Sequence, residues 1–150
     1  MRIEGDRDQL MREGDAAWTE LCAVLDATDP DTPLHAPDSP EWTSRDVYTH
    51  FWRMHSSSMH AIRSELGTGD HFEWPGIDED ELNERHAAID RVISFEDARR
   101  VAIESRQQYR ALVASLTDAQ FDDIGRCHGD DLLGGHYRGH LSYIRAASQD

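Results

Sequence analysis

The stretch that decides the fold is Trp42-Thr43-Ser44-Arg45-Asp46-Val47-Tyr48-Thr49-His50-Phe51. Thr43 has the residue type and position of a helix N-cap, and Asp46, three residues later, can return the hydrogen bond in a capping box. From there the inward positions recur every three or four residues, through Val47, His50 and Phe51. The sequence therefore predicts a long amphipathic helix that begins at Thr43, carries His50 on its buried face and ends before Gly67.

The same helical period occurs in three further segments, and no segment alternates clearly enough to predict a strand. Between the first two helices lies a linker, residues 28–42, with four of the five prolines. It is long enough to cross the bundle, so the helices need not alternate up and down. We expect one all-α domain over residues 1–150, a four-helix bundle. The other long helices are expected at about 6–27, from 94 and at about 130–147, with a shorter helical segment over 78–90.

The composition excludes several classes of partner. The chain has 30 acidic and 15 basic residues and a formal charge of −15, and every basic residue is arginine. A surface this acidic repels nucleic acid and anionic membranes, so we expect a small-molecule partner. The sequence has no apolar run long enough to span a membrane and no secretory signal pattern, and Cys22 and Cys127 form no disulfide framework. We therefore expect a cytoplasmic protein with reduced thiols.

Geometry selects three of the nine histidines. His136 and His140 are four residues apart, so they project from one face of a helix, within its apolar stripe. His50, His55 and His60 are five residues apart, and each step rotates by about 140°. Only His50 then shares the buried face, while His55 and His60 are expected at the surface. Cys127 and His128 precede His136 by too many residues to reach it along one helix, and we leave them out of the site.

Three inward-facing imidazoles can be read in two ways. Each could be a core histidine with its own hydrogen bond, but three polar rings in one small core are costly without a shared partner. A divalent metal ion satisfies all three at once, with Zn²⁺ the first choice and Ni²⁺ or Fe²⁺ also suited. Three histidine ligands leave a coordination position open, as in catalytic zinc sites. Asp46 could support His50 from behind, although the capping role is the stronger expectation.

Two segments resemble a known family. Residues 41–50, E-W-T-S-R-D-V-Y-T-H, resemble the entry to the second helix of the DinB-like superfamily, and residues 136–145, H-Y-R-G-H-L-S-Y-I-R, resemble its last-helix signature. This superfamily includes the N-terminal domain of mycothiol-dependent maleylpyruvate isomerases. The resemblance implies a four-helix bundle, often dimeric, with a metal held by His50, His136 and His140. It also implies a low-molecular-weight thiol such as mycothiol as cofactor or co-substrate.

We therefore expect a metal-dependent, thiol-dependent S-transferase or isomerase-like enzyme that acts on a small electrophile. The alternatives are a metal-water hydrolase, or a protection protein that sequesters a small molecule without turnover. An anionic thiol would need positive charge nearby, and Arg53 and Arg138 are the nearest candidates for cofactor binding. The sequence assigns no catalytic residue. Four aromatic residues are candidates for pocket walls, although a core role is more common for each: Trp42, Phe51, Trp52 and Tyr137.

Overall fold

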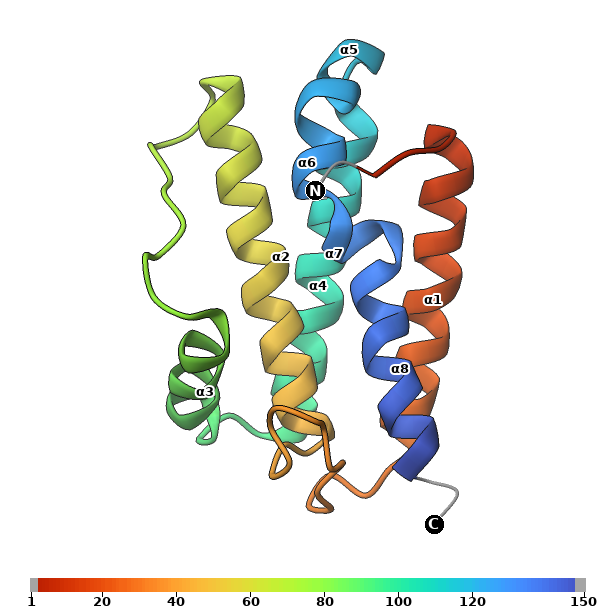
Figure 1. Ribbon diagram of the computed structural model, residues 1–150, viewed down its shortest axis with the longest axis vertical. Coiled ribbons are helices and arrows are strands. Elements are labelled where there is room, and N and C mark those ends of the chain that lie inside the picture. The colour runs from red at the N-terminus through yellow and green to blue at the C-terminus, as the bar shows by residue number, and fades with distance from the viewer. Residues whose placement is uncertain (1–2, 148–150) are drawn as a thin grey trace.

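The computed structural model describes residues 3–147, without the side chains of residues 130, 131 and 147. Every regular element in this part of the chain is helical, and four long helices pack side by side (Figure 1). The expected all-α class and four-helix bundle are confirmed. The four long helices are α1 (Arg7–Ala27), α2 (Ser44–Leu66), α4 (Phe95–Ser115) and α8 (Gly135–Ala147).

The helices do not alternate up and down. In Figure 1, α1 runs down, α2 and α4 both run up, and α8 runs down. The proline-rich linker, residues 28–43, crosses the lower end of the bundle between α1 and α2. The second long connection, residues 67–94, returns along the outside of α2 and carries α3 (Glu79–Asp90). Because α3 lies outside the bundle, α2 packs against α3 on one face and against the other long helices on another.

The helix start and stop signals in the sequence act as expected. The Asp46 carboxylate accepts hydrogen bonds from the Thr43 N–H at 2.9 Å and from the Thr43 hydroxyl at 3.2 Å. At the other end of α2, Gly67 has a φ of 71°, a left-handed conformation that glycine adopts without steric cost. The Ser94 hydroxyl accepts from the Asp97 N–H at 3.1 Å and caps α4.

The last helix is shorter than the one expected over 130–147. The structure has α7 (Asp130–Leu133), then Gly134 with a φ of 108°, then α8. A Cβ added at Gly14 of α1 would lie 2.1 Å from the Leu132 carbonyl oxygen, so the α7 backbone rests directly on α1. Helical periodicity cannot reveal such a backbone contact. The break fixes where α8 begins, one residue before His136.

Three short helical turns precede α7. They are α5 (Asp118–Gln120), the π-helical turn η1 (Phe121–Gly125) and α6 (Arg126–His128). Thr117 caps the first of them, with its hydroxyl accepting from the Gln120 N–H at 3.2 Å. This segment, expected only as a turn and a short acidic stretch, closes the upper end of the bundle in Figure 1.

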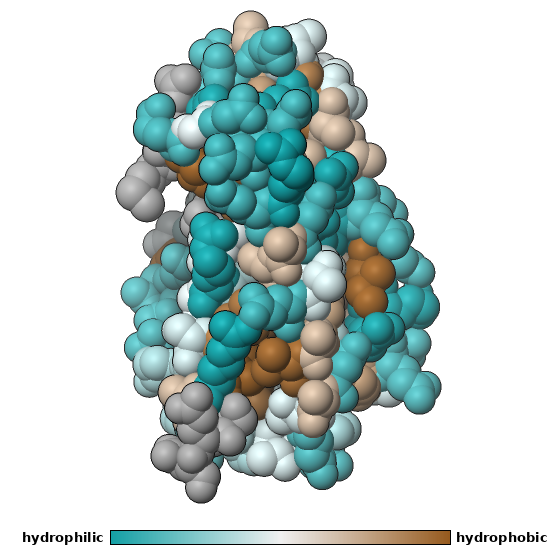
Figure 2. All heavy atoms as spheres, turned by 90° about the vertical axis from the view of Figure 1, so that its right-hand side faces the viewer, coloured by the Kyte–Doolittle hydropathy of each residue, from teal (hydrophilic) through white to brown (hydrophobic). Residues whose placement is uncertain are grey.

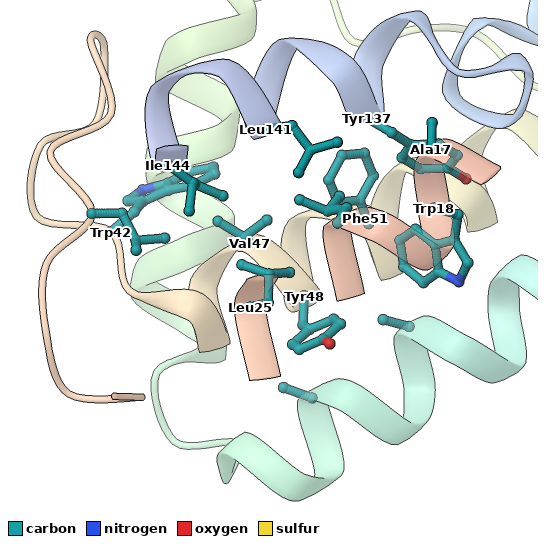
Figure 3. Close-up of a cluster of buried hydrophobic side chains, with 14 of the residues drawn as sticks. Ala17, Trp18, Leu25, Trp42, Val47, Tyr48, Phe51, Tyr137, Leu141 and Ile144 are labelled. Atoms are coloured by element: carbon teal, nitrogen blue, oxygen red, sulfur yellow. The ribbon is translucent and has the colours of Figure 1, made fainter. Parts of the chain in front are cut away.

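The core has two parts, one towards each end of the bundle. At the lower end of Figure 1, α1, α2 and α8 contribute the labelled side chains of Figure 3, where Trp42 at the end of the linker lies near Ile144. Leu25, Val47 and Phe51 are fully buried there. The second part joins α1, α2, α4 and α7 through large apolar residues: Leu10, Met11, Met59, Ile62, Tyr109, Val113, Leu116, Phe121, Leu132 and Leu133.

The face of the molecule on the α1 side is largely hydrophilic, with small apolar patches (Figure 2). This agrees with the acidic composition. Across residues 3–147, no helix combines the length and the apolar character needed to cross a membrane.

Asp15 connects α1 to α4, and we expect its removal to lower stability. Its carboxylate accepts from the Arg106 guanidinium at 2.9 Å and from Arg110 at 2.8 Å. Arg106 is buried, so the substitution Asp15→Ala removes the counter-charge of a desolvated cation. Because the carboxylate is 36% exposed, solvent screens part of this effect. We expect the free energy of unfolding to fall by about 1–2 kcal/mol in urea titrations at pH 7.

The pH dependence of this contribution has a defined sign. Hydrogen bonds from Arg110 and Arg106 lower the pKa of Asp15 from its ordinary value of 3.8. The contribution is therefore complete above pH 3.8 and is lost as the pH falls through the lower pKa of the folded state. Glu104→Ala, which removes the exposed ion pair of Glu104 with Arg100, serves as the control and should change stability much less. Equal effects of the two substitutions would contradict a special role for Asp15.

Candidate metal centre

Three imidazole nitrogens meet at one point between α2 and α8. The Nε2 atom of His136 lies 3.1 Å from Nε2 of His50 and 3.0 Å from Nε2 of His140. One ligand atom from each ring lies within 4.8 Å of the others, and the group could hold a metal ion. The structure thus brings together the three residues that helix geometry selected, while the binding of a metal stays a prediction.

The spacing of the nitrogens fits a single ion. Zinc–nitrogen bonds are about 2.0–2.1 Å long, so two nitrogens on a tetrahedral zinc lie about 3.3 Å apart. The observed separations of 3.0 and 3.1 Å are a few tenths of an ångström shorter. They also suit N–H···N hydrogen bonds, but then the one proton or lone pair on Nε2 of His136 would serve two neighbours. A metal ion gives each lone pair its own bond.

The surroundings favour the neutral, metal-binding form of the rings. Burial, followed by the proximity of His136 and His140, holds the pKa of His50 well below its ordinary value. On His140, Nδ1 is in hydrogen-bonding contact with the Tyr143 hydroxyl, and burial raises the pKa of that phenol. When Nδ1–H of His140 donates to the Tyr143 oxygen, Nε2 keeps its lone pair for a metal.

An aromatic floor lies beneath the cluster. The ring of Phe51, which is fully buried, has its centroid 4.9 Å from the centroids of both His136 and His140. The indole of Trp42 lies 5.2 Å from the ring of His50. The buried ring of Phe51 excludes water from one side of the cluster, so any exchangeable ligand must approach from another side.

Three cavities adjoin the cluster, with volumes of about 120, 390 and 480 Å³. The first and second reach His50, the second and third reach His136, and the second also reaches His140. The facing wall comes from α3 and the loop before it, and Asn83 lines all three cavities. No helical period or ligand spacing points to Asn83 as a site residue, because only the return path of residues 67–94 brings α3 to this position.

The two arginine candidates for cofactor binding lie in different surroundings. Arg53 lines the smallest cavity, but its guanidinium makes two hydrogen bonds, of 2.6 and 2.7 Å, to the buried carboxylate of Asp90. Arg138 is exposed on α8 and is not among the residues that line the three cavities. Neither arginine therefore presents an uncommitted positive charge to the three histidines.

The four aromatic candidates for pocket walls differ in whether they line a cavity or lie in the core. Trp42 lines two of the cavities, while Phe51 and Tyr137 are fully buried in the core. Trp52 is half-buried against the core, and the Arg53 guanidinium lies 5.3 Å from its ring centroid. Asp46 has the capping role that was the stronger expectation.

The two cysteines are free and differ in their surroundings. Burial raises the pKa of Cys22 to about 11, which makes it a poor nucleophile at neutral pH. Cys127 is exposed and, with His128, lines the largest cavity together with His136. Spacing along a single helix predicts that Cys127 and His128 lie too far from His136 to join the site. The break before α8 instead folds this segment back towards His136, although neither residue joins the group of metal-binding atoms.

The expectation that His55 lies at the surface is wrong. His55 is fully buried, with Nδ1 3.0 Å from the Ser105 hydroxyl and Nε2 2.8 Å from the Tyr137 hydroxyl. Because Ser105 donates to the Ala102 carbonyl at 2.9 Å, it accepts from Nδ1–H of His55, and Tyr137 donates to Nε2. The rotation by 140° takes His55 away from His50 and into the interface with α4. His60 is exposed, as expected.

Comparison with known proteins gives one match. A protein-family model described as the DinB superfamily matches residues 13–143, a span that includes all three histidines of the cluster. No curated protein and no solved structure matches the chain.

Proposed function

The chain belongs to the DinB superfamily, and from this premise we propose that it is a metal-dependent enzyme whose single divalent ion is held by His50, His136 and His140. The observation that carries the proposal is the convergence of the three Nε2 atoms beside open cavities. An all-nitrogen imidazole set suits Zn²⁺, the ion that we propose first, and also suits Ni²⁺ or Fe²⁺. We also propose that residues 1–150 form a single domain. A homodimer and a cytoplasmic location remain predictions.

The reaction that we propose is transfer or rearrangement on a small electrophile with the help of a low-molecular-weight thiol such as mycothiol. Bound at the three histidines, the ion would lower the pKa of a thiol or water and so supply a nucleophile at neutral pH. The residues of the chain position this chemistry: Tyr143 orients the His140 ring, and the ring of Phe51 packs against it. The cavities of about 390 and 480 Å³ give room for a thiol and a small second substrate.

Consumption of an electrophile with and without thiol tests this function. The zinc-loaded protein is incubated with monochlorobimane, with or without mycothiol, and the bimane conjugate is followed by fluorescence. We expect conjugation above the uncatalysed rate that requires the thiol and is lost in His136→Ala. His60→Ala is the matched control, because His60 is exposed on the same helix as His50 and lies outside the three cavities.

The other outcomes separate the alternatives. Equal consumption of the electrophile without thiol would indicate hydrolysis by a metal-bound water. Stoichiometric binding of the electrophile without consumption would indicate sequestration. Thiol-dependent activity that survives in His136→Ala would contradict the proposed site.

A further inference from the structure

The three cavities beside the histidines are referred to together as the cleft. Carboxylates line its two larger cavities. Glu79 and Asn83 are one turn apart on α3, and both line the two larger cavities. Asp80, and Asp38 from the linker, line the cavity of about 390 Å³ that reaches all three histidines. Three carboxylates therefore belong to the same cavity as the candidate metal ligands.

Aromatic rings line the same cavities as these carboxylates. Trp42 and Tyr143 line the cavity of about 390 Å³, and Trp74 lines the other two. Trp74 is 48% exposed, which is high for so large an apolar side chain, and its ring stands edge-on to that of Phe72 at 4.8 Å. Faces of tryptophan and tyrosine rings attract ammonium groups, and carboxylates provide the counter-charge. The combination of rings and carboxylates is typical of sites that bind cations.

Few positively charged side chains of the described residues lie near these carboxylates. Among residues 3–147, no arginine lines either of the two larger cavities. Arg53, in the smallest cavity, is neutralised by the two hydrogen bonds to Asp90. His128 is in contact with the Glu65 carboxylate. A negatively charged group on a ligand that lies among these carboxylates, rather than at the metal ion, would therefore meet repulsion.

From this distribution of charge and aromatic surface we propose that the cleft selects small molecules that carry a protonated amine and discriminates against anionic ones. The amine lies among Glu79, Asp80 and the aromatic rings, and the reactive end of the molecule faces the three histidines. This inference rests on the proposed function, because it names the class of thiol or substrate that the metal centre receives. It also replaces the expectation that arginines would recruit an anionic thiol.

A series of three thiols of similar length tests the selection by charge. The probes are cysteamine, 2-mercaptoethanol and 3-mercaptopropionate, which differ in carrying a cation, no charge or an anion. Each is titrated into the Co²⁺-loaded protein, and binding is followed by the sulfur-to-cobalt charge-transfer band. Because the thiols differ in acidity, the measured quantity is the ratio of the dissociation constants of 3-mercaptopropionate and cysteamine, compared between protein variants.

We expect this ratio to be about tenfold larger in the wild type than in Glu79→Gln/Asp80→Asn at low salt, since each partly exposed charge contributes up to about fivefold. The difference should shrink at 0.5 M salt, where exposed charges are screened. Glu81→Gln/Glu104→Gln is the control: it removes the same net charge from exposed positions outside the three cavities and should keep the wild-type ratio. Circular dichroism checks that the variants remain folded.

The experiment distinguishes failure of the selection by charge from failure of the proposed metal centre. If all three thiols produce the charge-transfer band but their ratio is the same in the wild type and in Glu79→Gln/Asp80→Asn, selection by charge is wrong and the metal centre stands. If the control changes the ratio as much as the cleft variant, the effect is one of net charge and the inference is overturned. If the wild type binds no Co²⁺, the proposed function fails and the inference fails with it.

Discussion

His136→Ala is expected to weaken the binding of a divalent metal ion by at least about a hundredfold, because changes that only touch the support of a ligand already cost 10–100-fold. Nε2 of His136 lies 3.1 Å from Nε2 of His50 and 3.0 Å from Nε2 of His140, so it is the nitrogen that links the other two. Without it, two donors remain on different helices. Competition with a chromophoric chelator measures the change in the dissociation constant of Zn²⁺.

A thermal measurement gives an independent view of the same substitution. A metal that binds the folded state raises its stability by about 2.7 kcal/mol at a free concentration of 100 times the dissociation constant. Added Zn²⁺ should therefore raise the unfolding temperature of the wild type and of His60→Ala, but hardly that of His136→Ala. An equal rise in His136→Ala would show that the ion binds elsewhere.

His55→Ala should have the largest effect on the stability of the protein without metal. The substitution leaves a cavity among the rings of Trp18, Phe51 and Tyr109, whose centroids lie 5.4 to 5.9 Å from that of His55. It also removes the hydrogen bonds to the hydroxyls of Tyr137 and Ser105. We expect the free energy of unfolding to fall by about 3–5 kcal/mol, as for other large buried residues cut to alanine.

Urea titration of the metal-free protein measures this loss, and His60→Ala on the same helix serves as the control. An exposed substitution of that kind should stay within about 0.5 kcal/mol of the wild type. His55→Ala keeps all three nitrogen donors, so the folded variant should still bind one metal ion per chain. A loss of less than about 1 kcal/mol would contradict the buried position of His55.

The beginning of α2 shows how far local patterns reach. Thr43 and Asp46 indicate the helix start in the sequence, and the period of the apolar residues predicts that His50 lies on the buried face. His136 and His140 follow from their spacing within the apolar stripe of α8. In each case the information is local, because capping and helical rotation depend only on nearby residues. This is why the class of fold and the three histidines could be predicted.

His55 and Gly134 show where local patterns fail. A helix in a bundle has neighbours on more than one side, and α2 buries His55 against α4, outside the stripe that contains His50. The break at Gly134 depends on the close approach of α7 to Gly14, more than a hundred residues away in sequence. The wall of the cleft formed by α3 is likewise a product of chain topology, which no periodicity in α3 itself reveals.

The most direct test of the metal centre is the metal content of the protein itself. The metal-free wild type and His50→Ala/His136→Ala are titrated with Zn²⁺, the bound metal is counted by mass spectrometry, and the ligands of the bound ion are identified by X-ray absorption. We expect one tightly bound ion per wild-type chain with three imidazole nitrogens, and none in the double variant. Less than a tenth of an equivalent in the wild type, or a full equivalent in the double variant, would contradict a metal centre at His50, His136 and His140.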